Sequence, residues 1–197
     1  MKLRDLTMGR RSSEIRAWAF KMRGGIWTAL FCAILFLAEP NFSVLPAMLV
    51  LVAVGQALRF WAAGCIKRYR GEEAKAGALV TWGPYAIVRN PLYLGNGLIG
   101  LGWSLLAGPR AASLFVMSYL ILYVFLIIPY EETILERCFC EEFHRYKERV
   151  GRLIPRIPFD LREIAGPFQW SVLWDSERHS LWVTILGTSL LLSRGWW

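Results

Sequence analysis

The feature that most constrains this chain is a series of long apolar runs separated by basic segments. Five runs are candidates for membrane-spanning helices: residues 24–39, 42–66, 91–107, 111–129 and 180–193. A helix needs about 20 predominantly apolar residues to cross a bilayer, and the first and last runs are the shortest. With 55% hydrophobic and only 19% charged residues, the chain is not a disordered, disulfide-rich or ordinary soluble protein. We expect an all-α fold, a polytopic membrane helical bundle with about five transmembrane helices.

The positive charges are divided unevenly between the two sides that these runs define. Twenty of the 23 lysines and arginines precede the first run or fall in the polar segments 67–90 and 130–178, whereas Arg110 and Arg194 fall on the other side. Cytoplasmic loops of membrane proteins carry an excess of Lys and Arg. We therefore expect a multi-pass membrane protein with a cytosolic N-terminus and a cytosolic active site. Because the charges border the membrane, the net charge of +8 does not indicate a nucleic-acid partner.

The same pattern divides the chain into three parts. Residues 1–23 form a basic cytosolic N-terminal segment, 24–157 a membrane core, and 158–197 an interfacial segment with the final transmembrane helix. The first part is not expected to be a cleavable signal peptide, because its basic stretch is long and no small-residue cleavage site follows. The last part contains Trp170, Trp174 and Trp182, which are typical of a membrane interface.

No metal site is expected. The chain has four cysteines without a CxxC pair and two isolated histidines, and the cysteines are interpreted as small buried residues.

The segment 77–95, GALVTWGPYAIVRNPLYLG, contains the first candidate site. Pro91 suits the first turn of a helix, and Asn90 suits its N-cap. The free N–H groups and positive dipole end of such a helix favour a carboxylate, and Arg89 is adjacent. A structural alternative is a capped interfacial helix with an arginine that reaches the lipid headgroups.

Three glycines in the third run spell GxGxxG at Gly95, Gly97 and Gly100. A dinucleotide-binding fingerprint needs a preceding strand and an acidic residue about 20 positions further on, and both are absent here. Small residues that allow helices to pack closely are the better interpretation.

The segment 131–150, EETILERCFCEEFHRYKERV, contains the second candidate site. Its apolar residues recur at helical spacing, which predicts a cytosolic amphipathic helix. Glu131 and Glu132 begin this helix at the membrane border, on the same side as Arg89, where they could attract a sulfonium or α-ammonium group. Carboxylates also stabilise any helix start. Arg59, near the end of the second run, is either a functional intramembrane residue or one that extends to the interface.

These two segments resemble the isoprenylcysteine carboxyl methyltransferase family and its phospholipid methyltransferase relatives. Gly83-Pro84-Tyr85, followed by Arg89 to Gly95, is similar to the signature G-x-Y-x-x-x-R-H-P-x-Y-x-G. Pro129 to Tyr146, followed by Gly151 to Pro155, is similar to a second block, P-x-E-E-x-x-L-x-x-x-F-G-x-E-Y-x-x-Y…R-x-x-P. The similarity covers roughly residues 42–157.

The resemblance implies a membrane methyltransferase that uses S-adenosylmethionine, with the methyltransferase-like core at 24–157. Its lipidic or small hydrophobic acceptor would enter from the bilayer. Carried over residue by residue, the cofactor-binding positions are Gly77, Ala78, Leu79, Val80, Tyr85, Asn90, Pro91, Leu92, Tyr93, Glu131 and Glu132. Arg89, Glu132 and Tyr85 are the predicted catalytic residues, with Glu132 or Tyr85 as the base if the acceptor is an amine. Arg59 and Arg152 are predicted to bind the acceptor.

The chain departs from the family pattern at three positions. Asn90 replaces the family histidine, Cys140 replaces a glycine, and Ile127 stands where the prenylcysteine enzymes have an arginine that holds the substrate carboxylate. The acceptor is therefore either a carboxylate, as in isoprenylcysteine, or a phospholipid amine. A membrane protein that keeps the fold without turnover and a nicotinamide-dependent sterol-type reductase are further alternatives.

Overall fold

The computed structural model describes residues 2–66, 79–157 and 161–196, and the parts described contain helices and no named strand. The long helices are α1 (Lys2–Phe36), α2 (Leu45–Cys65), α3 (Pro91–Leu106), α4 (Pro109–Tyr119), α5 (Ile128–Arg149) and α6 (Trp170–Ser193). The π-helical η3 (Leu120–Ile127) joins α4 to α5 without a loop. The described residues also contain four short 3-10 turns: η1 (Phe42–Val44), η2 (Gly83–Ala86), η4 (Leu161–Ile164) and η5 (Arg194–Trp196).

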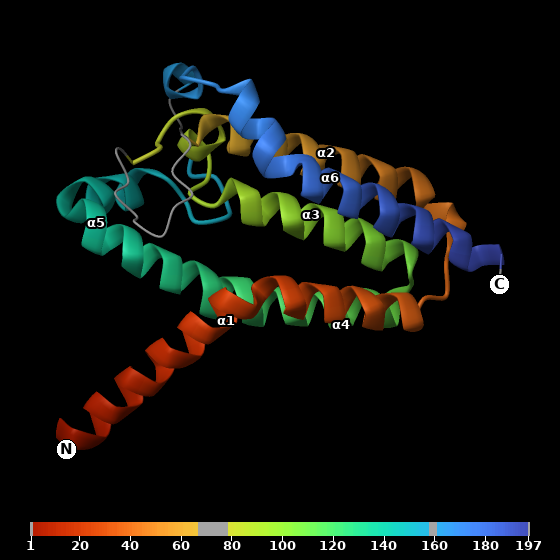
Figure 1. Cartoon of the computed structure of the whole chain (residues 1–197), viewed down its shortest axis with the longest axis horizontal. Coiled ribbons are helices and arrows are strands. Elements are labelled where there is room, and N and C mark those ends of the chain that lie inside the picture. Colours follow the sequence, from red (N-terminus) through yellow and green to blue (C-terminus); the bar gives the residue numbers. More distant parts are fainter. Residues whose placement is uncertain (1, 67–78, 158–160, 197) are drawn as a thin grey trace.

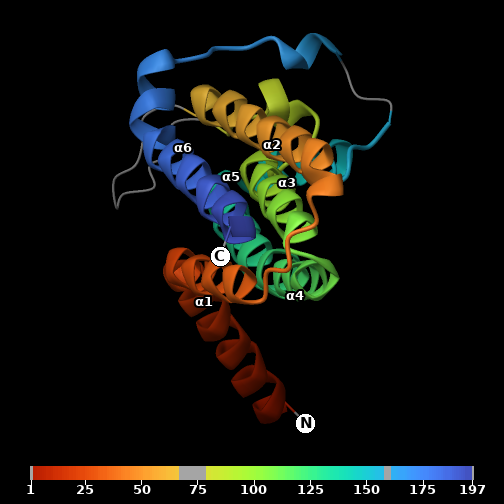
Figure 2. The same ribbon diagram turned by 90° about the vertical axis from the view of Figure 1, so that its right-hand side faces the viewer.

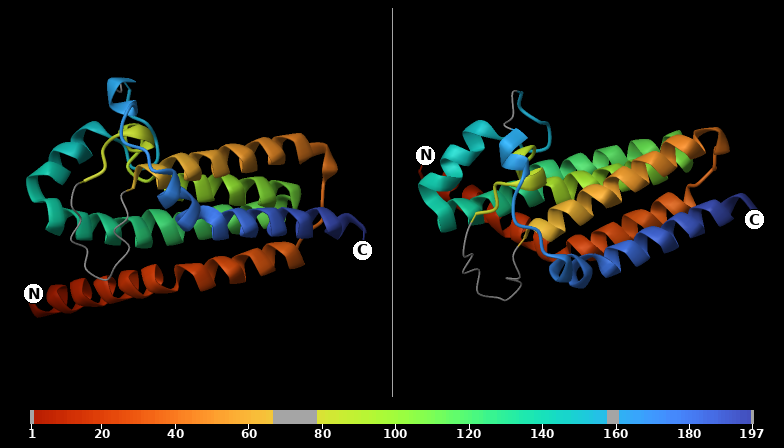
Figure 3. Two further views of the ribbon diagram at one scale, coloured as in Figure 1. Left: turned by 45° about the horizontal axis from the view of Figure 1, so that its top comes forward. Right: turned by 90° about the horizontal axis from the view of Figure 1, so that it is seen from above.

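The all-α membrane bundle predicted from the sequence is confirmed, but the count of five spans is not. Within the described residues, three helices are long and apolar enough to cross a membrane: Ser13–Phe36, Phe42–Cys65 and Pro109–Arg149. The third predicted run forms α3, which has 16 residues, and the fifth forms the second half of α6. The helices of the bundle run along the long axis of the molecule (Figures 1 and 3). The N-terminal part of α1 diverges from the other helices (Figures 1 and 2).

Glycines set how closely the two central helices approach. A Cβ atom at Gly55 of α2 would lie 2.7 Å from the carbonyl oxygen of Gly95 of α3, and a Cβ at Gly95 would lie 2.7 Å from that of Gly55. A Cβ atom at Gly97 would lie 2.9 Å from the ring of Tyr119, and one at Gly100 would lie closer still to the ring of Phe115. The glycines of the GxGxxG run therefore serve helix packing, as the sequence interpretation held.

The core lies between α1, α2, α3, α4 and the last part of α6, which Figure 2 shows along the bundle axis. Its buried members include Ile34, Met48, Ile99, Leu106 and Phe115, each less than 7% exposed. These apolar contacts hold α3 in place, with its first turn at the same end of the bundle as α5 (Figure 1).

The segment 131–150 does not form the single straight helix that its pattern predicts. Cys140 has φ 40° and ψ −110°, so the helix breaks there and its last part turns back. Phe143 and Tyr146 then face Leu135 and Phe139 across the break, and Leu79 completes this small apolar cluster. Cys140 occupies the position at which the family motif has a glycine. Glycine adopts a positive φ at the least steric cost.

Candidate active site

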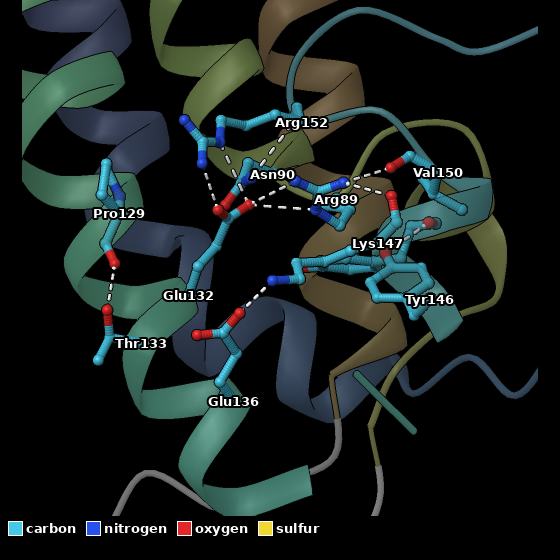
Figure 4. Close-up of polar contacts among 11 residues, drawn as sticks. Arg89, Asn90, Pro129, Glu132, Thr133, Glu136, Tyr146, Lys147, Val150 and Arg152 are labelled. Carbon is cyan, nitrogen blue, oxygen red and sulfur yellow. Dashed lines mark hydrogen bonds and ion pairs between the residues drawn. The ribbon is translucent and has the colours of Figure 1, made fainter. Parts of the chain in front are cut away.

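A buried ion-pair cluster joins the two sequence motifs. Glu132 at the start of α5 accepts hydrogen bonds from Arg89 Nη2 at 2.8 Å and from Arg152 Nη2 at 2.6 Å (Figure 4). The side chains of Arg89 and Glu132 are each 9% exposed, whereas Arg152 is 39% exposed. The Glu132 carboxylate is therefore held by two guanidinium groups and has little capacity left for a ligand.

Arg89 also fastens the loop before α3 to the segment after α5. Its Nη1 donates to the carbonyl oxygens of Lys147, at 3.2 Å, and Val150. Its backbone N–H donates to Gly151 O at 2.8 Å, and Asn90 Nδ2 donates to the Arg152 carbonyl at 3.2 Å. Most of the donors of Arg89 are thus used within the protein, which fits a residue that positions both motifs.

Asn90 occupies the predicted N-cap position of α3, but its side chain makes no capping bond within the described structure. Pro91 is the first helical residue and has no N–H. The first N–H groups of a helix have no intrahelical acceptor, so those of Leu92 and Tyr93 remain available. Both residues line the cavity described below.

The second acidic residue of the pair has a different environment. Glu131 accepts a hydrogen bond from the Tyr93 hydroxyl at 2.6 Å, and it makes no ion pair with any of the described residues. The Tyr119 hydroxyl donates to the Tyr93 carbonyl at 3.0 Å and fixes the backbone there. Of the two predicted carboxylates, Glu131 is the one whose charge is not matched by a bound arginine.

Arg59 does not extend to the membrane surface. Its Nε donates to Glu177 Oε2 at 2.9 Å, its Nη2 to Glu177 Oε1 at 3.0 Å, and its Nη1 to Asn96 Oδ1. Asn96 Nδ2 in turn donates to the Tyr123 hydroxyl at 3.3 Å. Glu177 is 1% exposed, so this is a buried ion pair between α2 and α6 that is extended by hydrogen bonds to α3 and η3.

These groups enclose a cavity of about 590 Å³, which we call the motif cavity. Of the predicted site residues, it is lined by Arg59, Leu79, Val80, Tyr85, Arg89, Asn90, Pro91, Leu92, Tyr93, Glu131 and Glu132. Arg152 does not line it but touches Glu132. Gly77 and Ala78 lie outside the described residues.

Sequence reasoning did not single out several residues of the motif cavity. Asn96 is a polar residue within an apolar run and Glu177 is a charged residue shortly before one, a signal that could have identified them. Phe20 and Trp27 of α1 also line the cavity, but nothing in the sequence separates them from other aromatic residues near a membrane border. Their position depends on how α1 packs against α5 and η3.

Tyr85 lies beside the cavity on η2, outside the long helices. Burial, followed by the negative charge of Glu131, raises the pKa of the Tyr85 hydroxyl well above its ordinary value of 10.0. The hydroxyl is therefore protonated at neutral pH, which does not suit the role of general base predicted from the sequence.

Ile127 is fully buried in an apolar cluster with Tyr123 and Ile128. This position offers no group that could bind a carboxylate. Within the described part of the chain, no group of three or more His, Cys, Asp or Glu side chains could hold a metal ion.

The fold and the motif cavity define a helical membrane protein with a ligand-sized cavity lined by polar and aromatic groups. The sequence profile described as phospholipid methyltransferase matches residues 41–142, and the chain belongs to that family. The family is part of the isoprenylcysteine carboxyl methyltransferase-like group, so the resemblance seen in the motifs is confirmed.

The chain is also similar to a curated protein, the nickel-cobalt-cadmium resistance protein NccN of Alcaligenes xylosoxydans xylosoxydans. The two are 27% identical over 157 residues, which cover 74% of this chain and 70% of the relative. No solved structure matches the chain significantly.

Proposed function

We propose that the protein transfers a methyl group from S-adenosylmethionine to the amine of a membrane lipid. The observation that carries this proposal is the Tyr93–Glu131 pair, in which a carboxylate faces the motif cavity and forms no ion pair with an arginine of the described residues. Family membership supports the reaction class, and the geometry of this pair favours an amine acceptor.

The residues of the motif cavity suit the cofactor. The cavity of about 590 Å³ falls within the 300–1,000 Å³ that is usual for ligand pockets. The uncapped start of α3 can accept a carboxylate. The rings of Tyr93 and Tyr123, 4.8 Å apart, can face a cation. When bound, S-adenosylmethionine supplies a methyl group activated by a positively charged sulfur.

Glu131 has the position needed to take a proton from an ammonium headgroup. Deprotonation leaves a lone pair on nitrogen, which forms the new N–C bond as the C–S bond breaks and its electrons go to sulfur. The proton remains on Glu131 until water or a buffer base accepts it. Exclusion of water and alignment of the two reacting groups supply most of the rate enhancement in such a displacement.

A carboxylate acceptor is less well supported. It would need an uncommitted cationic group in the cavity, yet Arg89 and Arg152 are bonded to Glu132, and position 127 is a buried isoleucine. Of the other two arginines that line the cavity, Arg59 is bonded to Glu177, and Arg23 donates to the Phe20 carbonyl and faces the charge of Glu131. Glu131 would repel such an acceptor. Arg59, which lines the cavity, remains our candidate for contacting the lipid headgroup, while Arg152 acts through Glu132 as a positioning residue.

The site is proposed to face the cytosol, where S-adenosylmethionine is made available. This orientation is supported by the twenty-to-two division of positive charges. The Arg110–Glu39 pair at 3.3 Å lies at the opposite end of the bundle from the motif cavity. We expect that a cysteine introduced at position 110 is not modified by an impermeant thiol reagent added to the cytosolic face.

The proposal is tested with purified protein in vesicles of phosphatidylethanolamine and with isotopically labelled S-adenosylmethionine. We expect labelled N-methylated lipid by mass spectrometry, and binding of S-adenosylhomocysteine by titration calorimetry. Glu131→Gln should lower the rate about 10²-fold or more, as loss of a general base does, and its rate should rise with pH as the free amine becomes more abundant.

Glu141→Gln, on an exposed surface of α5 and outside the specified positions of the second block, is the matched control and should behave as wild type. A wild type that methylates farnesylcysteine but no amine, with unchanged activity in Glu131→Gln, would contradict the amine assignment. Absence of S-adenosylhomocysteine binding at millimolar ligand would contradict the reaction class.

A further inference from the structure

A second cavity of about 570 Å³ adjoins the motif cavity. The two share Gly24, Trp27 and Asn96 as lining residues, so they meet between α1 and α3. The second cavity continues along α1 and α6, and we call it the α1–α6 groove. Both helices lie outside residues 41–142, which carry the family match, so the terminal regions of this chain supply the two walls of the groove, while α3 and α4 contribute to its floor.

The lining of the groove is mainly apolar, and the polar groups of Trp103 and Thr184 are bonded within the protein, whereas Trp27 Nε1, at the junction with the motif cavity, is buried with no hydrogen-bond partner in the described structure. Trp103 Nε1 donates to Thr188 Oγ1 at 2.9 Å, and the Thr184 hydroxyl donates to Gln56 Oε1 at 2.8 Å. The surface that remains is hydrocarbon and aromatic, which is a suitable surface for an alkyl chain and an unsuitable one for a polar ligand.

The floor of the groove is buried and one rim is open. Ile34, Ile99 and Phe115 in the floor are 2%, 6% and 2% exposed, whereas Val183 and Leu186 of α6 are 62% and 61% exposed. The opposite rim, on α1, belongs to a helix long and apolar enough to cross the membrane. The groove is thus open to the region that lipid chains occupy.

The length of the groove matches one leaflet. Its lining extends from Gly24 to Ile34 on α1 and from Ser180 to Leu190 on α6. Ten helical steps cover about 15 Å, which is half of the roughly 30 Å hydrocarbon thickness of a bilayer. A chain of one leaflet's depth would fill the groove from the motif cavity to the middle of the membrane.

We infer that the α1–α6 groove holds one alkyl chain of the methyl acceptor, so that its headgroup enters the motif cavity past Asn96 and Trp27. This inference rests on the proposed function and adds the site that binds one chain of the lipid acceptor. A second chain, where the acceptor has one, stays in the surrounding bilayer.

Two adjacent glycines of α1 offer a matched test. A Cβ atom at Gly24 meets nothing within 4 Å, and one at Gly25 meets only Met22 Cε at 4.0 Å. Gly24 lines both cavities and Gly25 lines neither. Because leucine favours a helix interior over glycine by about 0.5–1 kcal/mol, Gly24→Leu and Gly25→Leu should both fold.

We expect Gly24→Leu to lower methylation of a long-chain acceptor at least ten times more than methylation of a short-chain, water-soluble amine. Binding of S-adenosylhomocysteine is measured alongside, because Gly24 also lines the motif cavity. Gly25→Leu should behave as wild type in all three measurements. Equal activity of both variants toward the long-chain acceptor would overturn the inference. Loss of S-adenosylhomocysteine binding in Gly24→Leu would also overturn it, because the junction would then belong to the cofactor site.

A second measurement does not depend on turnover. A phosphatidylethanolamine with a diazirine in one acyl chain is photolysed in vesicles that contain the protein, and the adducts are located by mass spectrometry. We expect adducts on the groove floor, at Ile99 and Phe115, as well as on the outward-facing Phe125, which is 61% exposed. Labelling of Phe125 without the floor, or cross-links between two copies of the chain along α6, would refute chain binding even if methyl transfer is established. Floor labelling in a protein without turnover would support the groove and contradict only the proposed reaction.

Discussion

Replacing Glu132 by glutamine tests whether this residue positions the site or takes part in the reaction. Glu132 is 7% exposed and is bonded to Arg89 and Arg152. Removal of one member of a buried ion pair typically costs about 3–5 kcal/mol, since the remaining charge is left without its partner. We expect a value near the lower limit, about 3 kcal/mol, because Arg89 keeps its bonds to the Lys147 and Val150 carbonyls.

The assay is thermal unfolding of the protein in detergent, followed by near-ultraviolet circular dichroism. For a chain of 150–250 residues, each kcal/mol lowers Tm by about 2–4 °C, so Glu132→Gln should lower it by about 6–12 °C. Arg152→Gln is the matched control within the same cluster. Since Arg152 is 39% exposed, its loss should cost about 1 kcal/mol or less.

A Glu132→Gln protein that unfolds at the wild-type temperature but has lost methyl transfer would refute this reasoning. It would show that Glu132 acts on the reacting groups, the role first predicted from the sequence. Equal destabilisation by Arg152→Gln would show that exposure does not determine the strength of the two pairs.

Three further outcomes are expected. Cys140→Gly should raise the free energy of unfolding by about 1 kcal/mol, measured by thermal unfolding, whereas Cys140→Ala, which keeps a Cβ at φ 40°, should give no gain. Because the pKa of Tyr85 is raised in the folded state, the stability that its neutral hydroxyl contributes is complete below about pH 10 and declines above it. Tyr85→Phe should therefore change pH-dependent unfolding only in the alkaline range and leave the rate profile between about pH 6 and 9 unchanged. Glu177→Gln should lower the free energy of unfolding by about 3–5 kcal/mol, because it leaves the buried charge of Arg59 without its partner. The double variant Arg59→Met with Glu177→Met should recover much of this stability. A double variant no more stable than Glu177→Gln would contradict a simple ion pair.

Much of the site could be predicted from the sequence because the residues concerned lie in short, local patterns. Arg89 to Tyr93 and the pair Glu131–Glu132 each stand at a helix start next to an apolar run, and the positive charges place both on one side of the membrane. The structure brings them into contact, with Arg89 Nη2 2.8 Å from Glu132 Oε1 and Tyr93 Oη 2.6 Å from Glu131 Oε2.

The local patterns could not assign different environments to the two acids. Successive helical residues point in directions about 100° apart, so Glu131 and Glu132 face different neighbours. Which one meets the arginines depends on the rotation of α5 relative to α3 and on the segment from Val150 to Arg152. Similarly, the apolar spacing of residues 131–150 describes a straight helix and its folded-back form equally well, and only the backbone at Cys140 distinguishes them.

By itself, the sequence determined the membrane class, the main helices and the two motifs, because apolar length and helix-start chemistry are properties of neighbouring residues. Only the tertiary structure decided that Glu177 pairs with Arg59, 118 positions away, and that α1 and α6 border a groove continuous with the motif cavity. Pairing of distant groups depends on how whole helices rotate and pack, and that packing results from the sum of many weak apolar contacts rather than from any short pattern.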